Sequence, residues 1–316
     1  MIELSVIICA HNPRPDYLRR VLDALRDQSL SKDHWELLLV DNASDICVSG
    51  QCDLSWHSNG RHTLEPELGL TSARRRGIRE ARADLLVFVD DDNVLDPGYL
   101  SEAVRIKKEW PMLGVWGSGA IIPEFEKLPA EHLKRLLPYL ALRESDRIYW
   151  GNVPSCVESM PWGAGLCVRA SVAAEYFRSY EESSLRLSDR RGKSLISGGD
   201  VEICILACRA GFGMGVFPQL RLTHLIPKER TAEKYLLQLV EGSLISTILL
   251  NFKWKGHVPE TGISVRKVLS MLKVAMLHRA LDRRLYFANL RAAIKAKRII
   301  DASQGNILAP EARVQA

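Results

Sequence analysis

The chain has 316 residues, a formal net charge of +5, 47% hydrophobic residues and 26% charged residues. This composition is ordinary for a soluble globular protein and excludes disordered and fibrous classes. The length exceeds what one hydrophobic core usually supports, so we expect one large domain followed by a smaller region. The basic residues are concentrated after residue 230, where 14 Lys or Arg accompany 6 Asp or Glu.

The seven cysteines have no spacing typical of a zinc or redox site, which indicates a reducing compartment. The N-terminus lacks the features of a signal peptide, so we expect a cytoplasmic protein. The apolar stretch 235–252 contains Glu241 and is short for a membrane span, and we expect it to be a buried helix.

The first 110 residues alternate between strand and helix patterns. Residues 4–10 predict a buried strand, 16–30 an amphipathic helix, and 35–45 a second strand. Residues 46–70 predict loops with one short strand, 71–83 a helix, 84–93 a strand, and 96–110 a helix. This order predicts a mainly parallel α/β sheet, in which ligands bind at the carboxyl ends of the strands.

The pattern is looser after residue 110. We expect strands at 113–122 and 166–171, and helices at 131–142 and 200–211. Residues 231–316 are expected to be mainly helical. No repeat and no low-complexity tract interrupts the chain.

Three consecutive carboxylates, Asp90, Asp91 and Asp92, follow the strand at 84–93. A divalent metal would relieve their repulsion, since Mg²⁺ or Mn²⁺ binds one or two carboxylates together with substrate phosphates. Strand alternation predicts that Asp90 and Asp92 share one side and that Asp91 faces away, with a metal as the positive partner. A solvated acidic turn that caps the following helix is the alternative.

Asp41 ends the strand at 35–45, at the same expected sheet edge. It could accept hydrogen bonds from a ribose hydroxyl or a base N–H, or it could stabilise a turn in the sequence DNASD. No G-x-G-x-x-G follows the first strand and no P-loop sequence occurs, which argues against ordinary dinucleotide folds and P-loop NTPases.

Four segments in order resemble the signatures of glycosyltransferase family 2: SVIICAHN, LLLVDNASD, ELGLTSARRRGIREARADLLVFVDDD and GGDVEICILACRAG. The resemblance covers about residues 3–230. It implies the GT-A fold, an α/β fold with a mainly parallel central sheet flanked by helices, over 1–230, with a basic helical C-terminal extension over 231–316. It also implies an inverting transferase that uses a nucleotide-diphosphate sugar, most commonly a UDP-sugar, and Mn²⁺ or Mg²⁺.

The resemblance also implies roles for particular residues. Asp200 corresponds to the catalytic base, although the usual Glu-Asp pair is Gly199-Asp200 here. Asp92 and His224 are the expected metal ligands, and Lys228 and Arg230 are candidates for screening the diphosphate. The expected nucleotide-sugar residues are Ala10, Asn12, Asp41, Arg74, Asp90 and Asp91. Trp162 and Glu202 are candidates for the acceptor side.

Residues 265–300 combine apolar positions with many basic residues. Such a helix could lie on an anionic membrane, which would suit a glycan or lipid-linked acceptor in surface glycan or glycolipid assembly at the inner face of the membrane. It could equally pack on the domain with a solvated basic face. Aromatics are sparse among the charges, so we expect no nucleic-acid partner. A catalytically silent nucleotide-sugar-binding protein and a nucleotidyltransferase are the alternative functions.

Overall fold

The computed structural model describes residues 2–259 and 280–308. Among these residues, ten strands form one sheet, with the order β3-β2-β1-β4-β9-β6-β10-β5 and with β7 and β8 beside β6 and β10. The strands are β1 Leu4–Ala10, β2 Trp35–Asn42, β3 Gly60–Glu65, β4 Leu85–Asp90, β5 Asn93–Leu95, β6 Leu113–Phe125, β7 Arg143–Glu144, β8 Tyr149–Gly151, β9 Leu166–Arg169 and β10 Gly213–Ile226.

The sheet is mixed, and its longest ladders are parallel. β1 is parallel to both β2 and β4, and β6 is parallel to β10. β9 is antiparallel to both β4 and β6 and joins the two parallel parts. β1, β2 and β4 therefore end at one edge, which brings residues 10–12, 41–42 and 90–92 close together.

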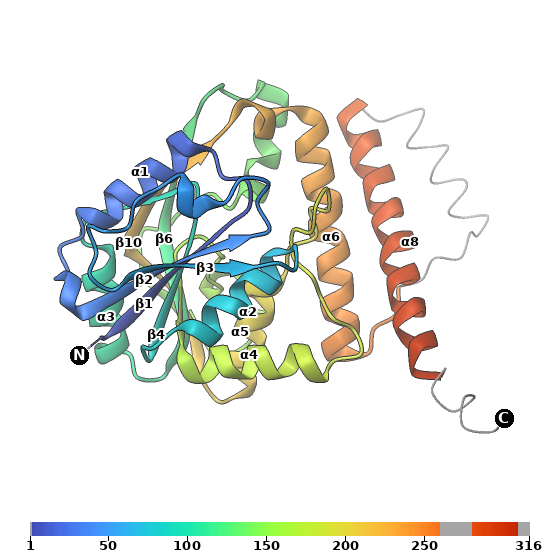
Figure 1. The fold of residues 1–316 in the computed structure, drawn as a ribbon. Helices are drawn as coiled ribbons and strands as arrows, with labels where there is room; N and C mark the ends of the chain where they lie inside the picture. The colour runs from blue at the N-terminus through green and yellow to red at the C-terminus, as the bar shows by residue number, and fades with distance from the viewer. Residues whose placement is uncertain (1, 260–279, 309–316) are drawn as a thin grey trace, which may run out of the picture.

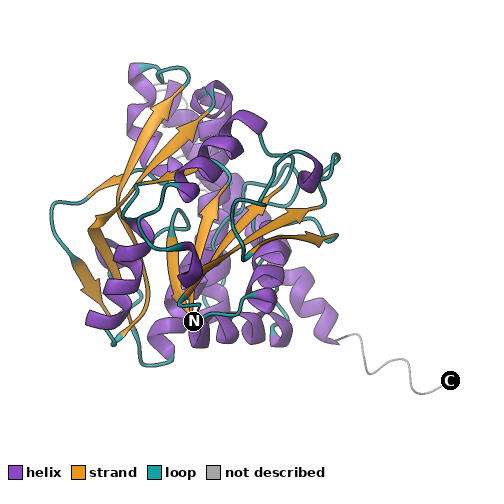
Figure 2. Ribbon diagram, turned by 60° about the vertical axis from the view of Figure 1, so that its left-hand side comes forward, coloured by secondary structure: helices purple, strands orange, loops and turns teal. Residues whose placement is uncertain are grey.

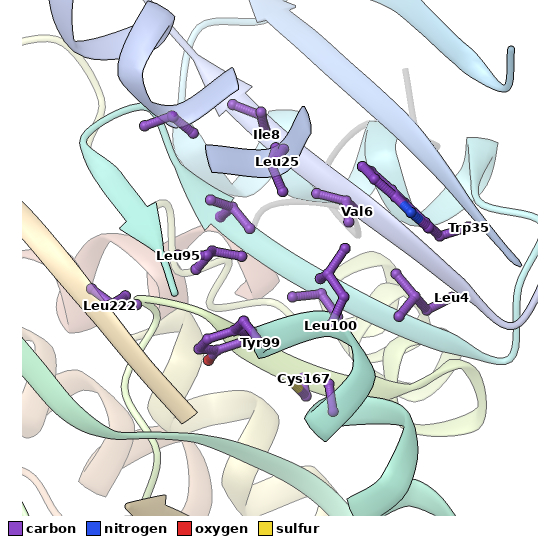
Figure 3. Close-up of a cluster of buried hydrophobic side chains, with 14 of the residues drawn as sticks. Leu4, Val6, Ile8, Leu25, Trp35, Leu95, Tyr99, Leu100, Cys167 and Leu222 are labelled. Atoms are coloured by element: carbon purple, nitrogen blue, oxygen red, sulfur yellow. The ribbon is translucent and has the colours of Figure 1, made fainter. Parts of the chain in front are cut away.

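Helices cover both faces of the sheet, as Figures 1 and 2 show. The α-helices are α1 Pro15–Arg26, α2 Leu70–Glu80, α3 Tyr99–Glu109, α4 Ala170–Glu182, α5 Gly199–Arg209, α6 Glu233–Lys255 and α8 Ala280–Leu308. α1 and α3 pack on one face, where Leu4, Val6 and Ile8 of β1 point (Figure 3). α2, α4 and α5 pack on the other face, around Ile7. The alternation of β1 side chains thus fills two cores.

One predicted helix has a different form. Residues 131–142 were expected to be α-helical, and Glu131–Leu140 instead forms a 3-10 helix, η3. Pro138 lies inside it, has no N–H to donate and would disturb an α-helical turn. Ala141 then adopts a left-handed conformation, with φ of 57°. This bend places Tyr139, Leu140 and Ala141 against the cavity described below.

The C-terminal helices α6 and α8 lie side by side beyond the sheet (Figure 1). Their contact is built from small residues, since Ala288, Ala292 and Ala296 are fully buried. Glu241 of α6 is nine-tenths buried and accepts hydrogen bonds from Arg291 Nε (2.8 Å) and Lys295 Nζ (2.6 Å) of α8. Within residues 280–304, α8 therefore packs on the domain and directs several basic side chains to α6.

The sequence raised two expectations here, a basic helix at 265–300 that could contact a membrane and a buried apolar helix at 235–252. Residues 265–279 of the predicted basic helix lie outside the described residues, so membrane contact stays a prediction. α6 is long and apolar enough to cross a membrane by length and composition, and about 50% of its most apolar window is buried inside the structure. A core helix passes the same test, and Leu236, Leu239, Leu249 and Leu250 of α6 are buried.

Candidate active site

A cavity of about 370 Å³ lies at the carboxyl ends of β1, β2 and β4. Its lining gathers residues from distant parts of the chain. The predicted residues that line it are Ala10, Asn12, Arg74, Asp90, Asp91, Asp92, Asp200, His224 and Arg230. The structure thus brings together nine residues that the sequence pattern or the family resemblance singled out.

Asp92 forms the centre of a charged cluster. Its Oδ2 accepts a hydrogen bond from Arg230 Nη1 at 2.6 Å and lies 3.6 Å from His224 Nε2. Burial alone would raise the pKa of Asp92, but His224 and Arg230 outweigh it and hold this pKa well below its usual range. The positive partner of the acidic run is therefore in part a side chain, Arg230, where we had expected a metal alone.

Asp91 differs from the expectation that it faces away. β4 ends at Asp90, and Asp91 and Asp92 belong to the following turn, so strand alternation no longer applies to them. Asp91 lines the cavity together with its neighbours. Burial and the adjacent charges of Asp92 and Asp90 raise the pKa of Asp91 to about 8. Burial and Asp92 also raise the pKa of Asp90.

Among the described residues, no group of three His, Cys, Asp or Glu side chains is arranged to hold a metal ion, so metal binding by this cluster stays a prediction. Burial and, after it, the repulsion between adjacent carboxylates raise the pKa values of Asp90 and Asp91, because Arg230 offsets only part of the negative charge. Asp92 oxygens and the imidazole of His224 are ligands that Mn²⁺ accepts. His224 Nδ1 is buried and has no hydrogen-bond partner among the described residues. Arg230 would have to share Asp92 with such a cation.

Asp200 also lines the cavity and lies in the first turn of α5. Its Oδ2 accepts a hydrogen bond from Gly163 N at 2.9 Å, and its Oδ1 accepts one from Val201 N at 2.9 Å. A Cβ at Gly163 would lie 2.8 Å from Arg74 Nη2, so glycine at this position leaves room for the Arg74 guanidinium. The carboxylate is thus oriented by backbone N–H groups and still reaches the cavity.

The charge of Arg74 interacts with both Asp90 and Asp200. Its side chain is 5% exposed, and its Nη1 lies 3.2 Å from Asp189 Oδ2. Burial disfavours the charged guanidinium, but Asp189, Asp90 and Asp200 outweigh it and raise the pKa of Arg74. A buried, permanently charged guanidinium at this position can hold a phosphate oxygen.

Asp41 is placed at the expected sheet edge but does not line the cavity. Its Oδ1 accepts a hydrogen bond from Ser44 N (3.1 Å) and its Oδ2 one from Val48 N (2.9 Å). Burial raises the pKa of Asp41, but these hydrogen bonds outweigh it, so the net pKa is lowered. The turn-stabilising role is therefore observed, and contact with a nucleoside stays a prediction.

Two residues suggested for the acceptor side lie elsewhere. Glu202 is two residues past Asp200 on α5, which turns it about 200° away, and its Oε1 pairs with Lys253 Nζ of α6 at 2.5 Å. Trp162 packs on the core, with the Arg143 guanidinium 4.1 Å from its ring centroid. Neither residue lines the cavity.

Sequence reasoning missed several residues of the cavity wall. Tyr235 and Leu239 come from α6, and Tyr139 and Leu140 come from η3. Arg190 also lines the cavity, with a left-handed φ of 45° and its Nη1 3.5 Å from Tyr235 Oη. No motif marks these residues, and their proximity depends on long-range packing of α6. The helical extension therefore contributes to the site.

Comparison with known proteins agrees with this geometry. Residues 5–161 match the sequence model described as "Glycosyl transferase family 2". Through these residues the chain belongs to glycosyl transferase family 2. The match ends before Asp200 and His224, so their roles stay predictions. The resemblance seen in the sequence is confirmed.

Individual relatives are distant. The chain is 26% identical over 157 residues to the uncharacterized glycosyltransferase YwdF of Bacillus subtilis (strain 168), which covers 49% of this chain and 56% of that protein. The match therefore spans little more than half of that relative's length. The crystal structure of S. aureus TarS 1-349 superimposes with a TM-score of 0.51 at 14% identity, over 96% of this chain and 83% of that chain. This likeness supports the expected GT-A fold.

Proposed function

We propose that the chain is an inverting glycosyltransferase that moves a sugar from a nucleotide-diphosphate donor to a hydroxyl acceptor, with Mn²⁺ or Mg²⁺. One observation carries the proposal: a single cavity is lined by Asp90, Asp92 and His224 and also by Asp200. Family membership supports a sugar-transfer reaction. An inverting transfer needs a general base for the acceptor hydroxyl, and a metal ion can stabilise the leaving diphosphate.

The donor would occupy the wall formed by β1, α2 and β4. Ala10, Asn12, Arg74 and Asp90 line this wall, and Asp92 and His224 would hold the divalent cation. A bound cation would offset the negative charge that develops on the departing diphosphate. The guanidinium groups of Arg74 and Arg230 would add hydrogen-bond donors to the phosphate oxygens.

The acceptor hydroxyl would approach from the wall formed by α5, α6 and η3. Asp200 would accept the hydroxyl proton while the oxygen attacks the anomeric carbon from the face opposite the leaving diphosphate, which inverts the configuration. The Gly163 N–H fixes the direction of the Asp200 carboxylate. Leu140, Leu239 and the ring of Tyr235 would exclude water on this side. A glycan or lipid-linked acceptor stays part of the proposal.

A thermal-shift panel tests the donor side. UDP-, GDP- and dTDP-sugars would be added with MnCl₂, with MgCl₂ or with EDTA, and we expect a UDP-sugar with metal to give the largest rise in melting temperature. A ligand at 100 times its dissociation constant adds about 2.7 kcal/mol of stability. Asp92→Asn should lose the metal-dependent part of the rise. Absence of a shift with every nucleotide sugar would contradict the proposal.

A turnover assay separates the proposal from a catalytically silent binding protein. Released nucleoside diphosphate would be measured for the donors that bind, with wild type and with Asp200→Asn. We expect release by the wild type and a loss of about 100-fold or more in the variant, since a positioned general base contributes about that factor. Donor binding without release by the wild type would favour the silent alternative.

A further inference from the structure

Asp189 is a buried carboxylate that no motif marks. It lies in the segment between α4 and α5, and its side chain is 1% exposed. Its Oδ1 accepts a hydrogen bond from Gly198 N (2.8 Å), and its Oδ2 accepts hydrogen bonds from Gly199 N (2.9 Å) and Arg74 Nη1 (3.2 Å). The Asp189 carboxylate thus contacts both the start of α5, which carries Asp200, and the guanidinium of Arg74.

The backbone of Asp189 is itself fixed to the first turn of α2. Its N–H donates to Thr71 Oγ1 at 2.9 Å, and its carbonyl accepts from Leu70 N at 3.0 Å. Asp189 therefore links the starts of α2 and α5, two helices that are more than a hundred residues apart in the chain. A carboxylate at a helix start also satisfies N–H groups that have no partner within the helix.

The first turn of α5 depends on close approach to this carboxylate. A Cβ added at Gly199 would lie 2.4 Å from Asp189 Oδ2, so only glycine fits there without a shift. Asp200 follows directly and takes its direction from the same turn and from Gly163 N. Movement of the turn away from Asp189 would therefore move the Asp200 carboxylate.

The charges around Asp200 show a second role for Asp189. The charged groups that face Asp200 are Arg74, Arg143 and Asp189, with the thiol of Cys204 nearby. Arg74 has carboxylates on several sides and pairs with Asp189. Without Asp189, Arg74 would be available to pair with Asp200 and would no longer be held for the donor.

We propose that Asp189 is a positioning residue that orients Asp200 and reserves Arg74 for the donor. The inference rests on the proposed function, in which Asp200 is the base and Arg74 faces the donor. Asp189 touches neither reactant. It acts through the Gly198 and Gly199 N–H groups on one side and through the Arg74 guanidinium on the other.

The test compares Asp189→Asn with Glu36→Gln. Glu36 is also a fully buried carboxylate paired with an arginine, Arg61, at 2.5 Å, but it lies on β2 at the other end of the strands and does not line the cavity. Hydrogen exchange of the Gly198 and Gly199 amides, which donate to Asp189, would be followed by NMR of ¹⁵N-labelled protein. This measurement requires no donor.

In Asp189→Asn, we expect the Gly198 and Gly199 amides to exchange at least about tenfold faster, because they lose the charged acceptor of their hydrogen bonds. Glu36→Gln should leave their exchange unchanged. With whichever of UDP-glucose, UDP-galactose or UDP-N-acetylglucosamine releases UDP fastest with MnCl₂, Asp189→Asn should lower kcat about tenfold or more and change KM less than about threefold.

The outcomes are distinct. Unchanged exchange of the Gly198 and Gly199 amides and an unchanged kcat in Asp189→Asn would overturn the inference. If Asp200→Asn released UDP at the wild-type rate, the proposed function would fail, whereas the amide exchange would still report on Asp189. If Asp189→Asn failed to fold, Thr71→Val would remove one hydrogen bond that holds Asp189 and would keep its charge. That variant should lower kcat, and wild-type kcat there would overturn the inference.

Discussion

Replacing Arg230 with methionine should expose the negative charge of Asp92 and increase the response of the protein to Mn²⁺. Arg230 Nη1 lies 2.6 Å from Asp92 Oδ2, and the two side chains are 32% and 8% exposed. Methionine keeps much of the aliphatic volume and removes the charge. Asp92 would then retain His224 as its neighbour, with Nε2 at 3.6 Å from Asp92 Oδ2.

The magnitude follows from the geometry of the pair. Opposite charges about 4 Å apart attract by roughly 4 kcal/mol at an effective dielectric constant of 20. Desolvation cancels much of this attraction, and the exposed third of Arg230 is screened by water. We therefore expect a loss of about 1–2 kcal/mol in the free energy of unfolding, or roughly 2–6 °C in melting temperature.

Calorimetry with and without MnCl₂ measures both effects. Without metal, Arg230→Met should melt below the wild type. With MnCl₂, its melting temperature should rise more than that of the wild type, because the cation no longer competes with Arg230 for Asp92. Equal melting temperatures and equal responses to Mn²⁺ would refute the reasoning.

Arg221→Met is the matched control for this experiment. Arg221 lies on β10, the strand that also carries His224. Its Nε is 3.6 Å from Asp96 Oδ2, and the two side chains are 51% and 48% exposed. Exposed pairs of this kind contribute less than about 1 kcal/mol. We expect the control to melt within about 2 °C of the wild type and to respond to Mn²⁺ as the wild type does.

Two further predictions concern the start of α5 and the contact between α6 and α8. Gly199→Ala should lower the free energy of unfolding by about 1–3 kcal/mol in urea titrations, because its Cβ would lie 2.4 Å from Asp189 Oδ2, whereas Gly50→Ala meets nothing within 4 Å and should be nearly neutral. Burial raises the pKa of Glu241, but hydrogen bonds from Lys295 and Arg291 outweigh it and lower this pKa. Its contribution of about 1 kcal/mol is therefore present above the unfolded pKa of about 4.3 and is lost as the pH falls through the folded value. Glu241→Gln should be less stable than the wild type at pH 7 and equal to it near about pH 3, and a constant difference across this range would contradict the assignment.

Local patterns predicted the first half of the fold well. The apolar runs at residues 4–10 and 85–90 are strands, and both bury nearly every side chain because helices cover the two faces of the sheet. The apolar spacing of residues 18–25 likewise places α1 on the sheet. These signals are local, since each depends on periodicity within a few turns or one strand.

Strand alternation did not predict the arrangement of Asp90, Asp91 and Asp92. Alternation predicts that Asp91 faces away, but the strand ends at Asp90, and Asp91 lies in the following turn and lines the cavity. The partner of Asp92 is Arg230, which is 138 positions away. Strand periodicity carries no information on either feature, because a turn and a long-range contact decide them.

The other residues of the site could not be predicted, because long-range packing brings them together. Asp189 carries no motif, and its role depends on glycine N–H groups and on Arg74, which lies 115 positions away. Tyr235 and Leu239 belong to a helix that the sequence assigned to a separate C-terminal region. Glu202 was considered for the site because it is close to Asp200 in sequence, although helix geometry turns it towards Lys253.

Turnover by Asp200→Asn tests the central claim most directly. The variant keeps the size of the side chain and removes the basic carboxylate. With the nucleotide sugar and metal that give the largest thermal shift, we predict that the variant still binds the donor and releases nucleoside diphosphate at least about 100-fold more slowly than the wild type. Release at the wild-type rate by a variant that binds the donor normally would contradict the account.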